Sequence, residues 1–182
     1  IEVLLPMFIE LVRAIGYAHQ RGVIHRDLKP GNILVDEECK PHVLDFGLAR
    51  TARGEKEDIE ATAAGEFLGT FAYAAPEQLR GNPDLIDVRT DIFALGVILY
   101  EILVGERPWQ TAGRGSIADL LIARLEETPK TPSTVRGGID PDLDVIALKC
   151  LKGRAEERYQ TCDALADDLE RFLTGRPILA RP

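Results

Sequence analysis

Apolar residues at helical spacing run through most of the chain, and one short segment with two strand-like runs interrupts them. In residues 4–20, Leu, Phe, Ile and Val recur at intervals of three and four, which predicts an amphipathic helix. Two short β-type runs follow at 33–35 and 42–44, and the polar segment 36–41 between them has the length of a hairpin turn. These patterns predict a mainly helical α+β fold that carries one small hairpin near its beginning.

Helical patterns also account for most of the second half of the chain. They predict helices at residues 76–80, 89–103, 116–127, 141–151 and 162–173, with Thr161 as the N-cap of the last. The segments 48–69 and 128–138 are polar and rich in small residues or in Pro and Gly, so both are expected to be loops.

Composition limits the compartment and the partners of the protein. With 182 residues the chain can bury a sizeable core, and its net charge of −8 argues against nucleic acid as a partner. The three cysteines are odd in number and show no CxxC spacing, which favours a reducing, cytoplasmic location. No signal peptide is evident, and the most apolar run, 92–100, is too short to span a bilayer. We therefore expect this run to form a buried core helix and the chain to lack a membrane segment.

Three short polar strings occur in an order that is informative as a set. His25–Asp27 is followed five residues later by Asn32, then by Asp45–Gly47 at the end of the second strand-like run, and then by Ala75–Glu77. These strings, in this order and at this spacing, resemble the signature of protein kinases. The chain is similar to the C-terminal lobe of eukaryotic-like, bacterial-type serine/threonine kinases. This resemblance implies a mainly helical lobe whose hairpin carries the catalytic and metal-binding loops.

The resemblance implies a role for each polar residue of the first two strings. Asp27 would orient the substrate hydroxyl and accept its proton, and Lys29 would neutralise the γ-phosphate of ATP as a point charge. Asn32 and Asp45 would supply oxygen ligands to Mg²⁺, a hard cation that takes few ligands from protein. Because phosphoryl transfer depends mainly on positioning and charge neutralisation, a short hairpin that fixes these groups relative to one another suits the reaction.

Two further residues complete the expected site. The Asp-x-Lys spacing resembles serine/threonine rather than tyrosine kinases, and Thr70 would then bond the catalytic Asp27 and Lys29. Leu34 would lie beneath the adenine ring of ATP. Arg26, directly before the catalytic aspartate, is typical of kinases that are controlled by phosphorylation of the activation loop, where the resemblance makes Thr62 the first candidate acceptor and Thr51 the second.

The resemblance also implies supporting contacts away from the chemistry. Asp91 would hold the backbone of the His-Arg-Asp loop, and Glu77 would form an ion pair with Arg158. His25 and Phe46 would stack on each other in the hydrophobic spine. The other two histidines, at positions 19 and 42, are expected to be ordinary surface or strand residues.

The most serious departure of the sequence from a complete kinase domain is an absence. The chain contains no GxGxxG phosphate loop, and no strand lysine or hinge is recognised. We therefore expect residues 1–175 to be the C-lobe of a kinase domain, residues 176–182 to begin a linker, and the ATP-covering lobe to lie elsewhere in the same parent chain. Such a fragment is expected to be inactive alone, and its parent could carry a membrane anchor.

Two other functions compete with a protein kinase that uses ATP, Mg²⁺ and protein substrates. A small-molecule phosphotransferase of the antibiotic-kinase type also uses an Asp and Asn loop, but it lacks the Ala-Pro-Glu segment found here. A pseudokinase or docking module without catalysis is the other alternative. The intact Asp27, Asn32 and Asp45 argue against it.

Overall fold

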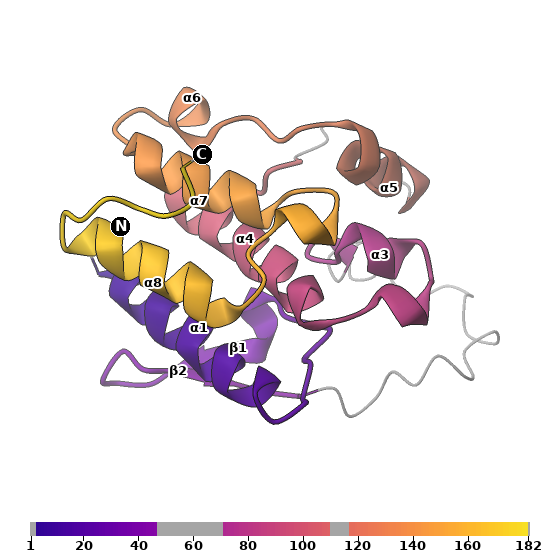
Figure 1. The fold of residues 1–182 in the computed structure, drawn as a ribbon, viewed down its shortest axis with the longest axis horizontal. Helices are drawn as coiled ribbons and strands as arrows, with labels where there is room; N and C mark the ends of the chain where they lie inside the picture. Colours follow the sequence, from indigo (N-terminus) through magenta and orange to yellow (C-terminus); the bar gives the residue numbers. More distant parts are fainter. Residues whose placement is uncertain (1–2, 47–70, 110–116, 182) are drawn as a thin grey trace.

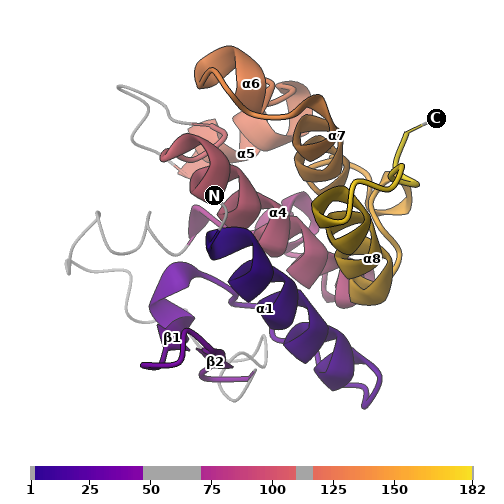
Figure 2. The ribbon, with the colours of Figure 1, turned by 90° about the vertical axis from the view of Figure 1, so that its left-hand side faces the viewer.

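The computed structural model describes residues 3–46, 71–109 and 117–181 of the chain. Figure 1 shows a body of helices with one small hairpin at its edge, which confirms the expected α+β class. The long helix α4 (Val88–Val104) lies at the centre, between α1 (Leu4–His19) and α7 (Pro141–Cys150). Helix α8 (Cys162–Leu173) runs beside α1 in both ribbon views (Figures 1 and 2).

Helix α4 is the core helix expected from the apolar run 92–100. Asp87 caps its first turn by accepting a hydrogen bond from the backbone N–H of Arg89 at 2.8 Å. Gly105 ends the helix in a left-handed conformation, with φ of 89°, that a side chain would disfavour. Every residue from 90 to 100 is buried, and so is Leu103, so α4 is the surface on which the other helices assemble.

Two glycines allow the helices to approach one another closely. A Cβ atom on Gly96 of α4 would lie 2.4 Å from the Cβ of Cys150 on α7, closer than packed carbon atoms can come. A Cβ on Gly16 of α1 would lie 3.2 Å from the Cβ of Cys162 at the start of α8. The close α4–α7 and α1–α8 contacts therefore require glycine, which has no side chain, at positions 96 and 16.

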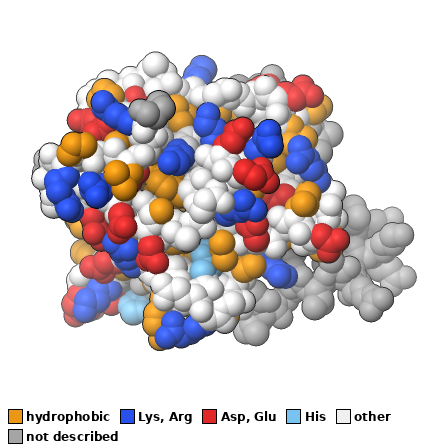
Figure 3. Space-filling view, viewed as in Figure 1, with side chains coloured by type: hydrophobic (Ala, Val, Ile, Leu, Met, Phe, Trp, Pro, Cys, Tyr) orange, Lys and Arg blue, Asp and Glu red, His pale blue; other side chains and the backbone are white. Residues whose placement is uncertain are grey.

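Surface ion pairs join α1 to α8 above this close contact. The guanidinium of Arg13 lies 3.1 Å from Asp163, 2.6 Å from Asp167 and 2.9 Å from Glu170. Figure 3 shows acidic and basic side chains interspersed over the face that α7 and α8 present. Because such pairs are exposed, they add little stability compared with the packing beneath them.

The hairpin consists of β1 (Ile33–Val35) and β2 (Pro41–Val43), paired antiparallel with Leu34 opposite His42. The second strand begins one residue earlier than the sequence predicted. Asp36 holds the turn, because its carboxylate accepts backbone hydrogen bonds from Glu38 at 3.1 Å and Lys40 at 2.8 Å. The hairpin thus closes locally and presents its two ends to the body.

The remaining elements follow the predicted helices with small differences. Helices α3 (Pro76–Leu79) and α5 (Ile117–Glu126) lie where expected, and Thr161 caps α8 by accepting from the N–H of Ala164 at 3.1 Å. The segment expected to be a loop at 128–138 contains the short helix α6 (Pro132–Val135). Three 3₁₀ turns, Pro30–Asn32, Pro83–Leu85 and Ala155–Glu157, were not predicted.

Beyond α8 the chain returns to the body. The side chain of Ile178 is buried, and the N–H of Leu179 donates to Asp168 at 2.6 Å. Within the described ranges, no helix combines the length and the apolar character needed to cross a bilayer.

The close α4–α7 contact predicts the effect of Gly96→Ala. Alanine favours a helix over glycine, but the added methyl overlaps Cys150, so the free energy of unfolding should fall by about 1–3 kcal/mol. Urea denaturation measures the change. The matched control is Gly137→Ala, where an added Cβ meets no atom within 4 Å, and this variant should unfold like the parent. Equal stability of the two variants would show that the helices are not in contact at Gly96.

Candidate active site

The carboxylate of Asp91, in the first turn of α4, holds the loop that precedes the hairpin. Its two oxygens accept the backbone N–H groups of His25 and Arg26, each at 2.8 Å. The residue is only 1% exposed. The expectation that Asp91 anchors this loop is confirmed.

The backbone of Arg26 makes this two-point contact possible. Its φ of 67° lies in the left-handed region, which turns two successive N–H groups toward one acceptor. The carbonyl of Arg26 accepts a hydrogen bond from Nε2 of Gln78 at 2.6 Å, and Oε1 of the same side chain accepts from the N–H of Ala75. The loop is therefore tied to α4 on one side and to α3 on the other.

His19 also binds Asp91, and the expectation that it is an ordinary surface or strand residue is wrong. Its Nε2 lies 2.8 Å from Oδ2 of Asp91, and its side chain is 8% exposed. A signal was available in the sequence, because His19 lies four residues after the core residue Ile15 and therefore on the buried face of α1. His42, by contrast, lies on β2 and pairs with Asp36 at the surface, as expected.

His25 connects this loop to the end of the hairpin. Its Nε2 donates to the carbonyl of Leu44 at 2.8 Å, while Nδ1 accepts the N–H of Asp27 at 3.2 Å. The ring also packs on Phe46 with a centroid separation of 5.1 Å and an interplanar angle of 54°. The predicted His25–Phe46 contact is confirmed.

Three of the predicted site residues meet directly. Nζ of Lys29 lies 3.0 Å from Oδ2 of Asp27. Nδ2 of Asn32 donates to the carbonyl of Asp27 at 2.8 Å and approaches Oδ2 of the same residue at 3.3 Å. The amide of Asn32 is thereby oriented with its oxygen directed away from Asp27, and a cation, a carboxylate and an amide converge on one point.

Asp45 follows a residue that is fixed to this loop at both of its backbone groups. Leu44 donates its N–H to the carbonyl of Asn32 at 2.9 Å and accepts from His25 through its own carbonyl. Asp45 itself has a φ of 56°, a left-handed conformation that aspartate tolerates better than most residues. The backbone of Asp45 is therefore held next to Asn32.

The remaining predicted residues divide into two groups. Leu34 lies on β1 and is 55% exposed. Thr70, Thr62 and Thr51 fall outside the described residues.

A buried ion pair fixes the segment that ends in Glu77. Arg158 donates to both carboxylate oxygens of Glu77, at 2.7 and 2.9 Å, and its side chain is fully buried. Thr90 donates to the same carboxylate at 2.9 Å. Burial alone would raise the pKa of Glu77, but the hydrogen bonds and charge of Arg158 outweigh it and lower that pKa. The predicted Glu77–Arg158 pair is confirmed.

A second buried arginine, which the sequence did not reveal, holds the other end of that segment. The guanidinium of Arg124 on α5 donates to the carbonyls of Phe71, Ala72 and Ala74. It also lies over the rings of Phe93 and Trp109. Burial lowers the pKa of Arg124 to about 10. Its position within an ordinary helical pattern gave no sign of this role.

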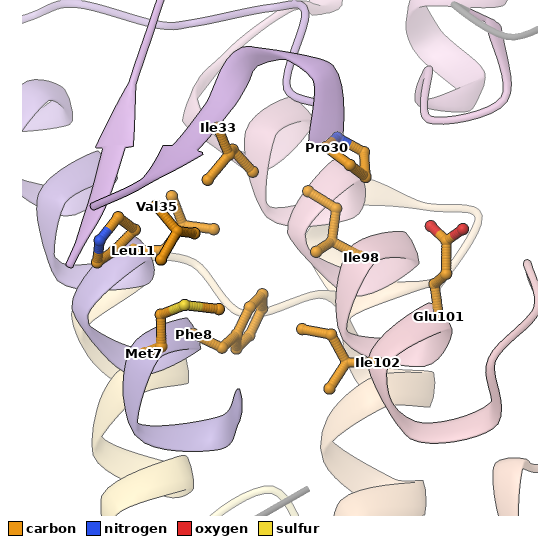
Figure 4. Close-up of a pocket in the computed structure, with 10 residues that line it drawn as sticks. Met7, Phe8, Leu11, Pro30, Ile33, Val35, Ile98, Glu101 and Ile102 are labelled. Carbon is orange, nitrogen blue, oxygen red and sulfur yellow. The ribbon is translucent and has the colours of Figure 1, made fainter. Parts of the chain in front are cut away.

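An apolar pocket of about 340 Å³ lies beside the hairpin but apart from these polar groups. Figure 4 shows Met7 and Phe8 of α1 facing Ile98 and Ile102 of α4 across it, with Val35 and Pro30 above. None of Asp27, Asn32 and Asp45 lines it. The converging polar groups of the loop therefore lie outside this pocket.

Comparison with known proteins agrees with the geometry. Residues 3–169 match the family described as "Protein kinase domain". The chain belongs to the protein kinase family. It is 39% identical over 165 residues to the serine/threonine-protein kinase PknB of Mycobacterium tuberculosis, and 41% identical to PknB of Mycobacterium leprae, with 91% of this chain aligned in each case. The alignment with the tyrosine-protein kinase MasK of Myxococcus xanthus is 182 positions long and 36% identical, and it covers 96% of this chain.

The chain spans about a quarter of the length of these kinases, since the matches cover 25% of either PknB and 27% of MasK. The alignments thus cover most of this chain but only a part of each relative.

The donor set of this kinase chain fits a nucleotide-bound Mg²⁺. Asn32 and Asp45 offer hard oxygens, and the hydrogen bonds of Asn32 direct its oxygen away from Asp27. In the part of the chain that the structure describes, no group of three or more His, Cys, Asp or Glu side chains could hold a metal ion by itself. Such a pair of ligands suits Mg²⁺, which is bound through one or two protein groups together with substrate phosphates.

The Glu77–Arg158 pair predicts a large effect of Glu77→Gln on the stability of this kinase chain. Removing one charge of a buried pair leaves the other uncompensated, so the free energy of unfolding should fall by about 3–5 kcal/mol. The control is Glu156→Gln, because Glu156 is exposed and lies 3.8 Å from Arg154; its effect should be less than about 1 kcal/mol. Urea denaturation of both variants makes the comparison.

The same pair predicts a pH dependence. Because the pKa of Glu77 is lower in the folded than in the unfolded protein, its contribution is complete above the ordinary carboxyl pKa and is lost as the pH falls through the folded value. The stability difference between the parent and Glu77→Gln should therefore shrink on acidification below about pH 4.5. A constant difference down to pH 2 would contradict the ion pair.

Proposed function

We propose that this chain forms the catalytic and substrate-facing half of a protein serine/threonine kinase, which transfers the γ-phosphate of ATP to Ser and Thr hydroxyls of proteins. The observation that supports it is the meeting of Asp27, Lys29 and Asn32 in one loop that the buried Asp91 holds. Membership of the kinase family gives this constellation its meaning.

In this proposal Asp27 orients the substrate hydroxyl and takes its proton as transfer proceeds. Lys29, 3.0 Å from Asp27, keeps that carboxylate in place and offers a positive charge to the phosphate being transferred. Asn32 and Asp45 are the residues that would hold Mg²⁺. When bound, Mg²⁺ and ATP supply charge neutralisation and the phosphoryl group itself.

The preference for Ser and Thr rests on the position of Lys29 and on the relatives. Lys29 is two residues after Asp27 and bonded to it, as the serine/threonine resemblance implies. Thr70 would complete this arrangement by bonding both residues. The chain matches relatives named serine/threonine-protein kinase and also one named tyrosine-protein kinase. Peptides that differ only in Ser, Thr or Tyr at the acceptor position therefore test the assignment.

The extent of the kinase unit is part of the proposal. Residues 1–175 form the C-lobe and residues 176–182 begin a linker whose first part still packs on that lobe through Ile178, while a glycine-rich lobe of the same parent chain covers ATP. Leu34, exposed on β1, would face the adenine ring across the boundary between the lobes. A pseudokinase that only docks partners is the alternative, and the intact Asp27, Asn32 and Asp45 argue against it.

The base assignment predicts the result of Asp27→Asn in the full-length protein. Asparagine keeps the size of the side chain and one acceptor oxygen but cannot accept the proton, so phosphorylation of a generic Ser/Thr peptide should fall by about 10²–10⁴-fold. Transfer of labelled phosphate measures the rate, and an unchanged melting temperature shows that the fold is kept. Asp142→Asn serves as a control, because Asp142 pairs with Arg181 on the surface of α7. Activity that survives Asp27→Asn would exclude this aspartate as the base.

The two-lobe proposal also predicts that the 182-residue chain alone transfers no measurable phosphate. Leu34 and Leu44 lie on the same face of the hairpin and are 55% and 38% exposed, which leaves the side of the hairpin that would meet ATP open to water. Incubation with labelled ATP and a Ser/Thr peptide, in parallel with the full-length protein, provides the test. Autophosphorylation by the purified chain would show that the second lobe is not needed.

A further inference from the structure

The network around Asp91 extends beyond His19 to a buried thiol. Sγ of Cys162 lies 3.6 Å from Nδ1 of His19, whose Nε2 is 2.8 Å from Asp91. Cys162 and Asp91 are each 1% exposed, and the side chain of His19 is 8% exposed. A chain of contacts thus runs from the start of α8, through the end of α1, to the residue that holds the catalytic loop.

The fold brings the thiol to this place through the close approach of two helices. Gly16 lies one turn before His19 on α1, and Cys162 packs against it where a side chain would intrude, with 3.2 Å between a built Cβ and the Cβ of Cys162. The N-cap Thr161 begins α8 directly before Cys162. Figures 1 and 2 show the two helices side by side.

The hydrogen bonds around His19 indicate which atoms of His19 and Cys162 carry protons. The carboxylate of Asp91 accepts the N–H groups of His25 and Arg26, so it is an acceptor, and in this arrangement Nε2 of His19 carries the proton between them. The partner of Nδ1 is the sulfur of Cys162, which can donate its S–H. Burial, and then the charge of Asp91, raise the pKa of Cys162 well above its ordinary value, so the thiol keeps this proton.

We propose that Cys162 is a positioning residue of the catalytic loop: its S–H donates to Nδ1 of His19 and keeps the imidazole in the tautomer whose Nε2–H donates to Asp91. The alternative tautomer would set the lone pair of Nε2 against the carboxylate and remove one of the bonds that orient it. The hydrogen bond stands on geometry alone, whereas its effect on catalysis rests on the proposed kinase function.

The first experiment observes the tautomer directly in the full-length protein. Histidine labelled with ¹⁵N reports by NMR which ring nitrogen carries the proton. His19 should be protonated at Nε2 and unprotonated at Nδ1 in the parent and in Cys162→Ser, whose hydroxyl also donates. In Cys162→Ala the Nε2–H tautomer should no longer be the sole form of the ring. The matched control is Cys150→Ala, which removes another buried thiol, on α7, and should leave His19 unchanged.

The second experiment follows the loop through its amide protons. The N–H groups of His25 and Arg26 should exchange with solvent faster in Cys162→Ala than in the parent, Cys162→Ser or Cys150→Ala. This readout does not depend on kinase activity. In a peptide assay, kcat of Cys162→Ala should fall by about three- to tenfold with KM for ATP unchanged, as expected for the loss of one hydrogen bond that orients the loop.

The outcomes separate the inference from the proposed function. An Nδ1-protonated His19 in the parent, or the same tautomer in Cys162→Ala as in the parent, overturns the hydrogen bond. A changed tautomer with unchanged amide exchange at His25 and Arg26 overturns the positioning role. If Cys162→Ala does not fold, Cys162→Ser decides, because loss of the Nε2–H form there contradicts the proposal. Absence of kinase activity in the parent overturns the proposed function and leaves both NMR tests valid.

Discussion

A single buried carboxylate organises the candidate site. Asp91 belongs to the first turn of the central helix, so the loop that it binds takes its position from the most deeply packed element of the body. A hydrogen bond to a charged group contributes about 1.5–3 kcal/mol, and a buried charge without such partners would be costly. The carboxylate and the loop therefore need each other, and Asp27 and Asn32 are placed as a consequence.

Segment 71–77 is held on a different principle. Arg158 meets a carboxylate, whereas Arg124 meets backbone carbonyls and aromatic faces. The first contact depends on one side chain of the segment and the second on none, since carbonyls are present whatever the sequence. The segment can consequently vary its side chains near Arg124 without losing that attachment, but it cannot change Glu77.

Local patterns predicted much of the fold, because helical periodicity and turn residues are written in neighbouring positions. The helix 162–173 and its cap Thr161 were predicted correctly, and motif spacing identified the loop, the hairpin and the Glu77–Arg158 pair. Helical spacing signalled that His19 lies on the buried face of its helix, but the sequence did not reveal what His19 or Arg124 binds, because a partner distant in the chain decides it. Helix α6 was not predicted because it is only four residues long and lies in a segment rich in Pro and Gly. For His19 the partner is Asp91, 72 residues away. The roles of Asp27, Lys29, Thr70, Leu34, Asn32 and Asp45 in catalysis remain predictions.

Both ends of the catalytic loop and hairpin unit carry a non-glycine residue with positive φ, Arg26 at 67° and Asp45 at 56°. Such a conformation costs about 1 kcal/mol or more for a residue with a side chain, and glycine would adopt it freely. Selection for stability alone would thus favour glycine at both positions, which would remove the carboxylate of Asp45 that we propose as a ligand of Mg²⁺. The strained backbone marks where this chain trades thermodynamic robustness for chemical capability.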